Sequence, residues 1–297
     1  MTSLKGTIIK GIAGFYYVAT VESGIYACRA RGIFRKEKKK PLVGDLVEVE
    51  VTDEKDREAS LTRILPRRNS LIRPAVANID QALVLFALRS PDPDGMLLDR
   101  FLILMEAQKV PVVICFNKAD LAGDSEALRW RSIYEKCGYD IYVISAEFDR
   151  GTDELRQCLR GKTTVVAGPS GAGKSTLTNL MQNVVKMETG ELSEKLRRGK
   201  NTTRHAELLP LGGGTFFCDT PGFTSLDLPA IEAKELDEFF PEFAPYRQDC
   251  RFQDCAHLQE PDCAVRKAQE EGLISRERYE HYRRFYEELK EREKNRW

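Results

Sequence analysis

Residues 168–175 read GPSGAGKS, and this stretch decides the fold. It matches the pattern G-x-x-x-x-G-K-[S/T], and it lies between an apolar run, TTVVA at 163–167, and a helical stretch, KSTLTNLMQ at 174–182. Strand, glycine loop and helix in this order form the context of a phosphate-binding loop, because backbone N–H groups and the helix N-terminus together hold phosphate oxygens. We expect a nucleotide to contact every residue of the loop and the threonine after it: Gly168, Pro169, Ser170, Gly171, Ala172, Gly173, Lys174, Ser175 and Thr176.

Two residues of this loop have expected chemical roles. Lys174 is expected to reach the β- and γ-phosphates, and Ser175 to ligate Mg²⁺. The metabolic P-loop kinases share this loop, so the loop alone does not define the reaction.

Two further segments are expected to sense the γ-phosphate. DTPG at 219–222 follows an apolar run, so Asp219 would hold Mg²⁺ through water and the Gly222 N–H would meet the γ-phosphate. The basic, turn-rich stretch before it contains Thr202 and Thr203, and one of these is expected to cap the metal. The sequence does not decide between the two threonines.

NKAD at 117–120 predicts which base is bound. The carboxylate of Asp120 can accept both the N1–H and the N2–H of guanine, a donor pair that adenine lacks. Asn117 can bond the Hoogsteen side and brace neighbouring loops, and the Lys118 stem can lie over the ring. Ser145-Ala146 follows the next apolar run, where a backbone N–H can meet guanine O6. The expected base-binding set is Asn117, Lys118, Ala119, Asp120, Ser145 and Ala146.

The base loops come before the phosphate loop in this chain. In an open α/β sheet, ligands bind outside the carboxyl ends of the strands, so the loops must meet in space and their order in the chain is free. Nearly continuous apolar runs alternate with helical segments between residues 80 and 220, which predicts a mostly parallel α/β sheet. We therefore expect a circularly permuted P-loop GTPase domain, and NKAD argues against a metabolic kinase.

The regions on either side of this sheet predict two further domains. Residues 4–65 contain short β-branched and aromatic runs between glycine turns, which fits a small OB-type barrel, with an SH3-like barrel as the alternative. The tail at 264–297 mixes ten basic with eight acidic residues, which predicts an exposed helix. The expected domains are 1–68, an RNA-binding OB-fold; 69–228, the GTPase domain; and 229–297, a mostly helical zinc-binding domain.

The stretch CRFQDCAHLQEPDC at 250–263 supplies a candidate metal site. Three thiolates and one imidazole form a complete tetrahedral set for one structural Zn²⁺ ion, with no position left for a catalytic water. A redox cluster is the alternative. The ligands would be Cys250, Cys255, His257 and Cys263.

Composition limits the partners. The chain has 297 residues with 46 basic and 46 acidic side chains, which excludes a uniformly basic nucleic-acid binder. Three basic runs still favour an RNA partner. No apolar run is long enough for a membrane helix, and the N-terminus has no apolar signal core, so we expect a cytoplasmic monomer with no membrane partner. The basic runs are residues 29–40, 61–73 and 195–204.

The whole chain resembles the ribosome small-subunit-dependent GTPase A family. The resemblance rests on NKADL, GPSGAGKSTLTN, DTPGF, the cysteine cluster, PAVANIDQALVLFAL at 74–88 and GKNTTRH at 199–205. It implies an OB-fold, a permuted GTPase domain and a zinc domain. It also implies GTP hydrolysis in late maturation of the small ribosomal subunit, with that subunit and its rRNA as partners.

One position differs from the family and another from many GTPases, and the second bears on the rate of hydrolysis. The family more often has a histidine just before the threonine pair, where this chain has Asn201. Phe223 follows DTPG, where many GTPases have a glutamine that orients the attacking water. We therefore expect slow hydrolysis alone and stimulation by the small subunit. The competing hypothesis is a nucleotide-gated RNA-binding module in which hydrolysis is incidental.

Overall fold

The structure is a computed structural model that divides into two compact units. The first unit comprises residues 1–83, 152–167 and 174–223, and the second comprises 84–151, 168–173 and 224–297. The structure describes residues 2–20, 23–30, 34, 40–71, 74–189, 206–219 and 227–295.

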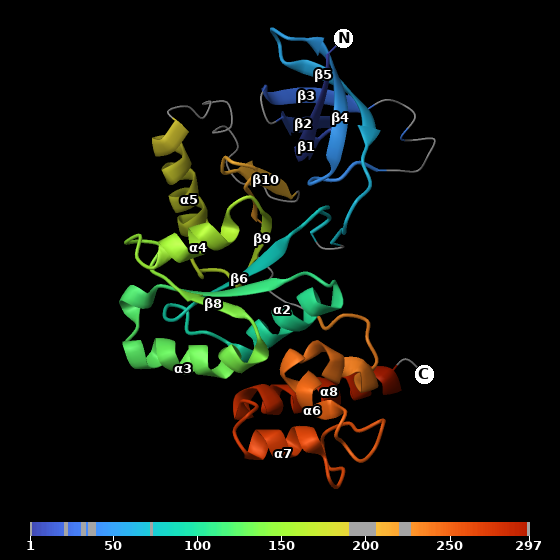
Figure 1. Ribbon diagram of the computed structural model, residues 1–297, viewed down its shortest axis with the longest axis vertical. Helices are drawn as coiled ribbons and strands as arrows, with labels where there is room; N and C mark the ends of the chain where they lie inside the picture. The colour runs from blue at the N-terminus through green and yellow to red at the C-terminus, as the bar shows by residue number, and fades with distance from the viewer. Residues whose placement is uncertain are drawn as a thin grey trace. The chain divides into compact units, whose positions relative to one another are not determined.

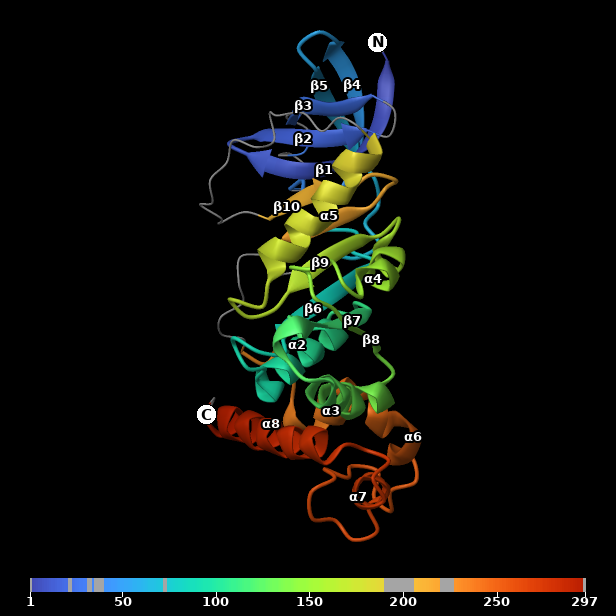
Figure 2. The same ribbon diagram turned by 90° about the vertical axis from the view of Figure 1, so that its left-hand side faces the viewer.

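Five strands of the first unit form a closed barrel in the order β1-β2-β3-β5-β4 (Figure 2). β3 pairs with β5 in parallel, while the other pairs described are antiparallel. Alternate residues point inward, so that Ile8, Val18 and Tyr26 are buried in the barrel core. The OB-type barrel expected from the sequence is confirmed. The strands are β1 (Ser3–Ile12), β2 (Phe15–Thr20), β3 (Gly24–Ala30), β4 (Leu46–Asp53) and β5 (Glu58–Ile64).

A six-stranded sheet has the order β10-β11-β9-β6-β7-β8. β7 and β8 are parallel, as are β9 and β11, and β10 is antiparallel to β11. The mostly parallel sheet is therefore confirmed, and every residue of β6 is buried, as its continuous apolar run predicted. The strands are β6 (Gln81–Ala87), β7 (Val112–Asn117), β8 (Asp140–Val143), β9 (Thr163–Ala167), β10 (Glu207–Pro210) and β11 (Phe216–Asp219).

Helices α4 (Thr152–Leu159) and α5 (Lys174–Thr189) belong to the first unit. The second unit contains the other helices given bounds here, and among the described residues no helix has the length and apolar character needed to cross a membrane. The helices of the second unit are α2 (Gly95–Ala107), α3 (Asp124–Tyr134), α6 (Ala244–Arg247), α7 (Ala264–Glu270) and α8 (Arg276–Lys294). Its 3₁₀ helices are η1 (Ala119–Leu121), η2 (Glu135–Cys137), η4 (Ala233–Phe239) and η5 (Pro241–Phe243).

The expectation of an exposed helix for the tail was wrong for α8. Arg278, Tyr282, Phe285 and Leu289 of α8 are buried, and Tyr282 packs edge-on against Phe240 at 5.2 Å between ring centroids. These four positions follow the helical period and form one buried stripe, which is apolar except for Arg278, while the other charged residues lie on the other faces. Figure 1 and Figure 2 both show α8, in dark red, above α7.

Candidate nucleotide site and metal centre

Asn117 joins three loops of the second unit at the carboxyl ends of the strands. Its side chain is almost fully buried, with 2% of the residue exposed. Nδ2 donates to the carbonyl of Ala172 in the phosphate loop at 3.0 Å, and Oδ1 accepts from the N–H of Ala146 at 3.0 Å. Both ends of the Asn117 amide group therefore bond to protein backbone, which is the bracing role expected from the sequence.

The glycines of the phosphate loop are explained by close approaches. Gly173 has φ +94°, and a Cβ there would overlap the amide nitrogen of Asn117. Gly168 has φ +147°, and a Cβ there would overlap the carbonyl oxygen of Leu85. At both positions the backbone conformation favours glycine, and the neighbouring atoms leave no space for a side chain.

Asp120 remains available to a base. It lies exposed on η1 and accepts a hydrogen bond at Oδ1 from the hydroxyl of Ser145, which is buried. A carboxylate has about four acceptor sites, so this bond leaves capacity for the two N–H groups of guanine. The N–H of Ala119 donates to Ile144 at 3.0 Å, which fixes the NKAD turn beside β8.

Lys118 adopts a left-handed backbone, with φ +60°, and its ammonium donates to the carbonyl of Ser90. The side chain thus spans from the base loop to the loop that follows β6. Pro91, in the same loop as Ser90, lies next to Gly171 of the phosphate loop. A Cβ added to Gly171 would be 3.2 Å from the Cδ of Pro91. The loops after β6 and β7 and the phosphate loop therefore meet at one place in the second unit.

The remaining predicted residues fall in two groups. Lys174, Ser175 and Thr176 form the first residues of α5, and Asp219 is the last residue of β11. Gly222, Thr202 and Thr203 lie outside the described residues.

The four predicted metal ligands come together in the second unit. Their ligand atoms all lie within 4.8 Å of one another. Sγ of Cys250 and Cys263 are 3.9 Å apart, and His257 Nδ1 lies 3.6 and 3.4 Å from them. A tetrahedral zinc ion with bonds of about 2.3 Å to sulfur and about 2.0 Å to nitrogen separates two sulfurs by about 3.8 Å and sulfur from nitrogen by about 3.5 Å. The cluster has the dimensions of a metal site, whereas a disulfide needs sulfurs about 2 Å apart.

The backbone and ring of His257 are fixed by its surroundings. His257 has φ +57°, and its carbonyl accepts a hydrogen bond from the hydroxyl of Tyr279 at 2.6 Å. The neighbouring Ala256 carbonyl accepts from Tyr282 at 3.0 Å, and Phe243 packs edge-on against the imidazole at 5.8 Å between centroids. Two tyrosines of α8 thus hold the metal-binding loop, a function that the sequence did not reveal.

Cys263 is prepared to ionise. Burial opposes the thiolate, but hydrogen bonds from His257 and from the Arg266 N–H outweigh it and lower the pKa of Cys263 to about 7. Cys28, in the barrel core, shows the opposite behaviour, since burial raises the pKa of its thiol to about 12. Metal binding requires thiolates, and within the cluster Cys263 differs in this respect from the buried Cys28.

Arg278 lies at the centre of a buried ionic cluster. Its side chain has no exposed area, and its guanidinium contacts Asp99 of α2 at 2.6 Å and Glu242 of η5 at 2.7 Å. It also stacks over the Phe240 ring at 4.4 Å. Burial opposes this charge, but the two carboxylates outweigh burial and raise the pKa of Arg278. Asp99 receives a second partner from α8, His281 Nδ1 at 2.6 Å.

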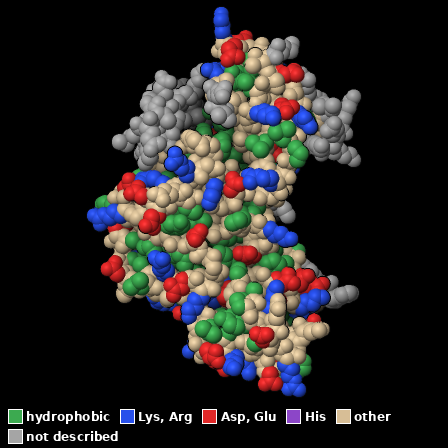
Figure 3. All heavy atoms as spheres, viewed as in Figure 1, with side chains coloured by type: hydrophobic (Ala, Val, Ile, Leu, Met, Phe, Trp, Pro, Cys, Tyr) green, Lys and Arg blue, Asp and Glu red, His purple; other side chains and the backbone are tan. Residues whose placement is uncertain are grey.

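The basic runs make different contributions to the surface. In 61–73, Arg67 pairs with the buried Asp45 at 2.6 Å and Arg68 pairs with Asp80 at 2.6 Å. These two arginines are occupied by contacts within the first unit, so this run offers less free charge than its sequence predicts. On the face in Figure 3, basic and acidic side chains of the described residues are interspersed. Most of the run 29–40 and all of 195–204 lie outside the described residues.

A phosphate loop that is joined through one asparagine to an NKAD loop earlier in the chain defines the class of a circularly permuted P-loop GTPase. The profile of the RsgA GTPase family matches residues 64–229, and that of the RsgA N-terminal domain matches residues 5–57. A relative from Agathobacter rectalis, named small ribosomal subunit biogenesis GTPase RsgA, is 52% identical over 98% of this chain and 100% of its own. A relative of the same name from Caldanaerobacter subterraneus is 48% identical over 100% and 99%.

Two crystal structures agree with these matches. YjeQ from Thermotoga maritima is 34% identical with a TM-score of 0.80, and the alignment covers 97% of this chain and 99% of YjeQ. YloQ, described as a circularly permuted GTPase, is 38% identical with a TM-score of 0.78, covering 98% and 96%. The chain therefore belongs to the RsgA GTPase family, and it is a GTP hydrolase.

Proposed function

We propose that this GTPase binds the small ribosomal subunit and couples GTP hydrolysis to late maturation of that subunit and to its own release. The observation that carries this proposal is the Asn117 brace, because it joins a guanine-reading loop to a phosphate loop in a member of the RsgA GTPase family. The relatives named for small ribosomal subunit biogenesis supply the partner. We propose that the chain works as a monomer in the cytoplasm.

The proposed nucleotide chemistry follows from the motifs. Lys174 contacts the β- and γ-phosphates, and Ser175 ligates the Mg²⁺ that accompanies GTP. Asp219 holds the same ion through water. Gly222 and one of the two threonines, Thr202 or Thr203, contact the γ-phosphate or its metal ion. These three residues lie outside the described part of the chain.

The proposed domains are 1–68 for RNA binding, 69–228 for the nucleotide and 229–297 for the metal. In the last of these, Cys250, Cys255, His257 and Cys263 hold one Zn²⁺, whose role is structural because four protein ligands fill its tetrahedral coordination. The ion would cross-link the two ends of the loop formed by residues 250–263.

The barrel offers an aromatic surface to RNA. Phe15 and Tyr17 on β2 are 37% and 36% exposed, and the Arg29 guanidinium lies 4.9 Å from the Phe15 ring centroid. Aromatic faces next to arginine bind unpaired bases by stacking, and OB-type barrels bind nucleic acid on this part of the fold. We therefore propose that rRNA contacts the chain through β2 and β3.

Nucleotide specificity tests the base site. We expect GTP to bind far more tightly than ATP, and Asp120→Asn to lose GTP affinity and to favour xanthosine triphosphate, which has a carbonyl at position 2. The loss of a charge-assisted hydrogen bond corresponds to roughly 1.5–3 kcal/mol. Equal affinity of the parent for ATP and GTP would remove the basis of the proposal.

Turnover with and without purified small subunits tests the partner. We expect slow single-turnover hydrolysis alone and stimulation by the subunit, since GTPases that receive a group in trans gain about 10³–10⁵-fold. The Phe15→Ala, Tyr17→Ala double variant should bind the subunit more weakly and keep its intrinsic hydrolysis. Fast hydrolysis that subunits leave unchanged would favour a nucleotide-gated RNA-binding module instead.

A further inference from the structure

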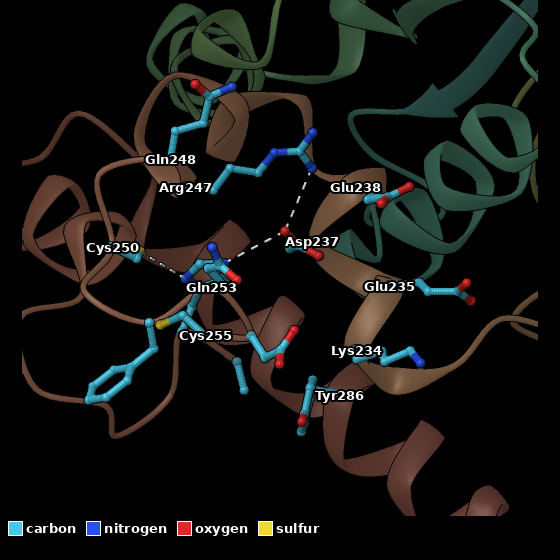
Figure 4. Close-up of a pocket in the computed structure, with 14 residues that line it drawn as sticks. Lys234, Glu235, Asp237, Glu238, Arg247, Gln248, Cys250, Gln253, Cys255 and Tyr286 are labelled. Atoms are coloured by element: carbon cyan, nitrogen blue, oxygen red, sulfur yellow. Dashed lines mark hydrogen bonds and ion pairs between the residues drawn. The ribbon is translucent and has the colours of Figure 1, made fainter.

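We propose that Asp237 is a positioning residue of the metal centre, which orients His257 so that Nδ1 faces the metal. The inference rests on the proposed zinc site and extends it to a residue beyond the four ligands. Asp237 lies on η4, and Oδ2 of its carboxylate is 3.7 Å from His257 Nε2. Figure 4 shows the carboxylate of Asp237 between Arg247 and the metal cluster, with a dashed line toward each.

The two ring nitrogens of His257 face different partners. Nδ1 lies 3.4–3.6 Å from two thiol sulfurs, whereas Nε2 is directed at Asp237. A metal bound at Nδ1 leaves the proton on Nε2, and a carboxylate next to that N–H fixes the ring orientation and makes the ligating nitrogen more basic. Asp237 is the carboxylate in that position.

Burial and charge favour this assignment. His257 is 2% exposed and the Asp237 side chain 18%, so water screens their interaction only partly. Three thiolates with Zn²⁺ carry a net negative charge, which would repel an uncompensated carboxylate. Arg247 contacts the same Oδ2 of Asp237 at 3.6 Å and supplies the compensating charge.

A cavity of about 660 Å³ adjoins the cluster. Cys250, Cys255 and His257 line it, and so do Asp237 and Arg247. Glu238, the next residue on η4, lines the same cavity and is exposed. Glu238 therefore provides a matched control, since it has the same charge on the same element.

The experiment is a double-mutant cycle on zinc affinity in the full chain, measured by competition with a chromophoric chelator. We expect Asp237→Asn to weaken zinc binding 10–100-fold, as loss of a ligand-orienting carboxylate typically does, and Glu238→Gln to leave it unchanged. In a His257→Cys background, which replaces the imidazole by a fourth thiolate, the effect of Asp237→Asn should fall below about threefold, since no Nε2–H remains.

Cobalt substitution adds a readout that a purely structural role would not move. The Asp237→Asn protein should show an altered ligand-field spectrum with bound Co²⁺, and the Glu238→Gln protein should match the parent. Arg247→Gln, which removes the compensating charge but keeps the carboxylate beside His257, should weaken zinc binding less than Asp237→Asn does, and it covers the case in which Asp237→Asn fails to fold.

The outcomes separate this inference from the zinc proposal. A parent protein that binds no zinc overturns both. A parent that binds one zinc, with Asp237→Asn binding as tightly, overturns only the positioning role of Asp237. An equal loss in the wild-type and His257→Cys backgrounds, or a loss in Arg247→Gln as large as in Asp237→Asn, also overturns it, because the effect would then not pass through the imidazole.

Discussion

Asn117 and Arg278 each hold three segments of the second unit together, but by different chemistry. Asn117 is neutral and bonds two backbone groups, at Ala172 and Ala146. Arg278 is charged and bonds two side chains, Asp99 and Glu242, which are as deeply buried as itself. A neutral amide between backbone groups costs little desolvation, whereas a buried ion pair must offset the desolvation of every charge in it. The hydrogen bonds of Asn117 are therefore expected to contribute less free energy than the ionic cluster. In the ionic cluster, removal of Arg278 leaves a buried charge unpaired.

The largest effect is expected from Arg278→Met. Removal of the guanidinium leaves the buried Glu242 without its counter-charge and Asp99 with His281 alone, and breaking a buried ion pair typically costs 3–5 kcal/mol of the free energy of unfolding. Urea unfolding followed by fluorescence measures this, because Trp130 of α3 is only 7% exposed and lies in the same unit.

Two controls interpret that result. Arg284 lies exposed on the same helix, and Arg284→Met should change the unfolding free energy by less than about 0.5 kcal/mol. The triple variant Arg278→Met, Asp99→Leu, Glu242→Leu should recover part of the lost stability, since apolar replacements of a whole buried cluster are often neutral. If Arg278→Met unfolds within about 1 kcal/mol of the parent, the ionic cluster does not hold the helices.

The next effect is expected from Asn117→Ala. The Ala172 carbonyl and the Ala146 N–H would lose their partner, at about 1–3 kcal/mol, which corresponds to a loss of GTP affinity of about 5- to 150-fold. Asn69 is a matched control, because its amide also bonds backbone, at Ile79 in the first unit, with distances of 2.7 and 2.8 Å. Asn69→Ala should leave GTP affinity intact, and an equal loss in both variants would mean that general stability, not the brace, sets affinity.

The same contrast explains what the sequence could predict. Asn117, Asp120 and Gly173 lie in short motifs whose residues act on nearby backbone, so their spacing in the chain reports their role. The metal ligands lie within fourteen consecutive residues, 250–263, and the structure brings all four together as expected.

The ionic cluster could not be predicted, because its partners are far apart in the sequence. Asp99 and Arg278 lie on α2 and α8, and nothing local to either distinguishes it from a surface charge. The burial of α8 did leave a signal in the helical spacing of Tyr282, Phe285 and Leu289, which the surrounding charges obscured.

A smaller effect is expected where the metal loop meets α8. Tyr279→Phe removes the hydroxyl that donates to the His257 carbonyl, and we expect a loss of about 1 kcal/mol in the unfolding free energy of the zinc-loaded protein. Tyr286 lies on the same helix and faces the cavity, so Tyr286→Phe is the control and should have no measurable effect. Equal losses in both variants would show that the hydrogen bond to His257 is not what matters.

The smallest effect concerns Glu106, a third carboxyl near Arg278. Burial raises the pKa of Glu106, although a hydrogen bond from Tyr139 at 3.0 Å opposes the shift. A raised pKa means that the folded chain holds this proton more tightly than the unfolded chain, whose glutamate titrates at about 4.3. The stability from Glu106 is therefore fully present below about pH 4 and is lost as the pH rises through its raised folded pKa.

Glu106→Gln is neutral at every pH and can still accept from Tyr139. The variant should match the parent below about pH 4 and be more stable near about pH 7. Because Glu106 is half-buried, water screens part of the interaction and the gain should stay under about 1 kcal/mol. Glu287→Gln, on the exposed face of α8, should show no such pH-dependent gain in urea unfolding. A Glu106→Gln protein less stable than the parent at about pH 7 would mean that the ion cluster needs this third negative charge, and that Asp99 and Glu242 alone do not balance Arg278.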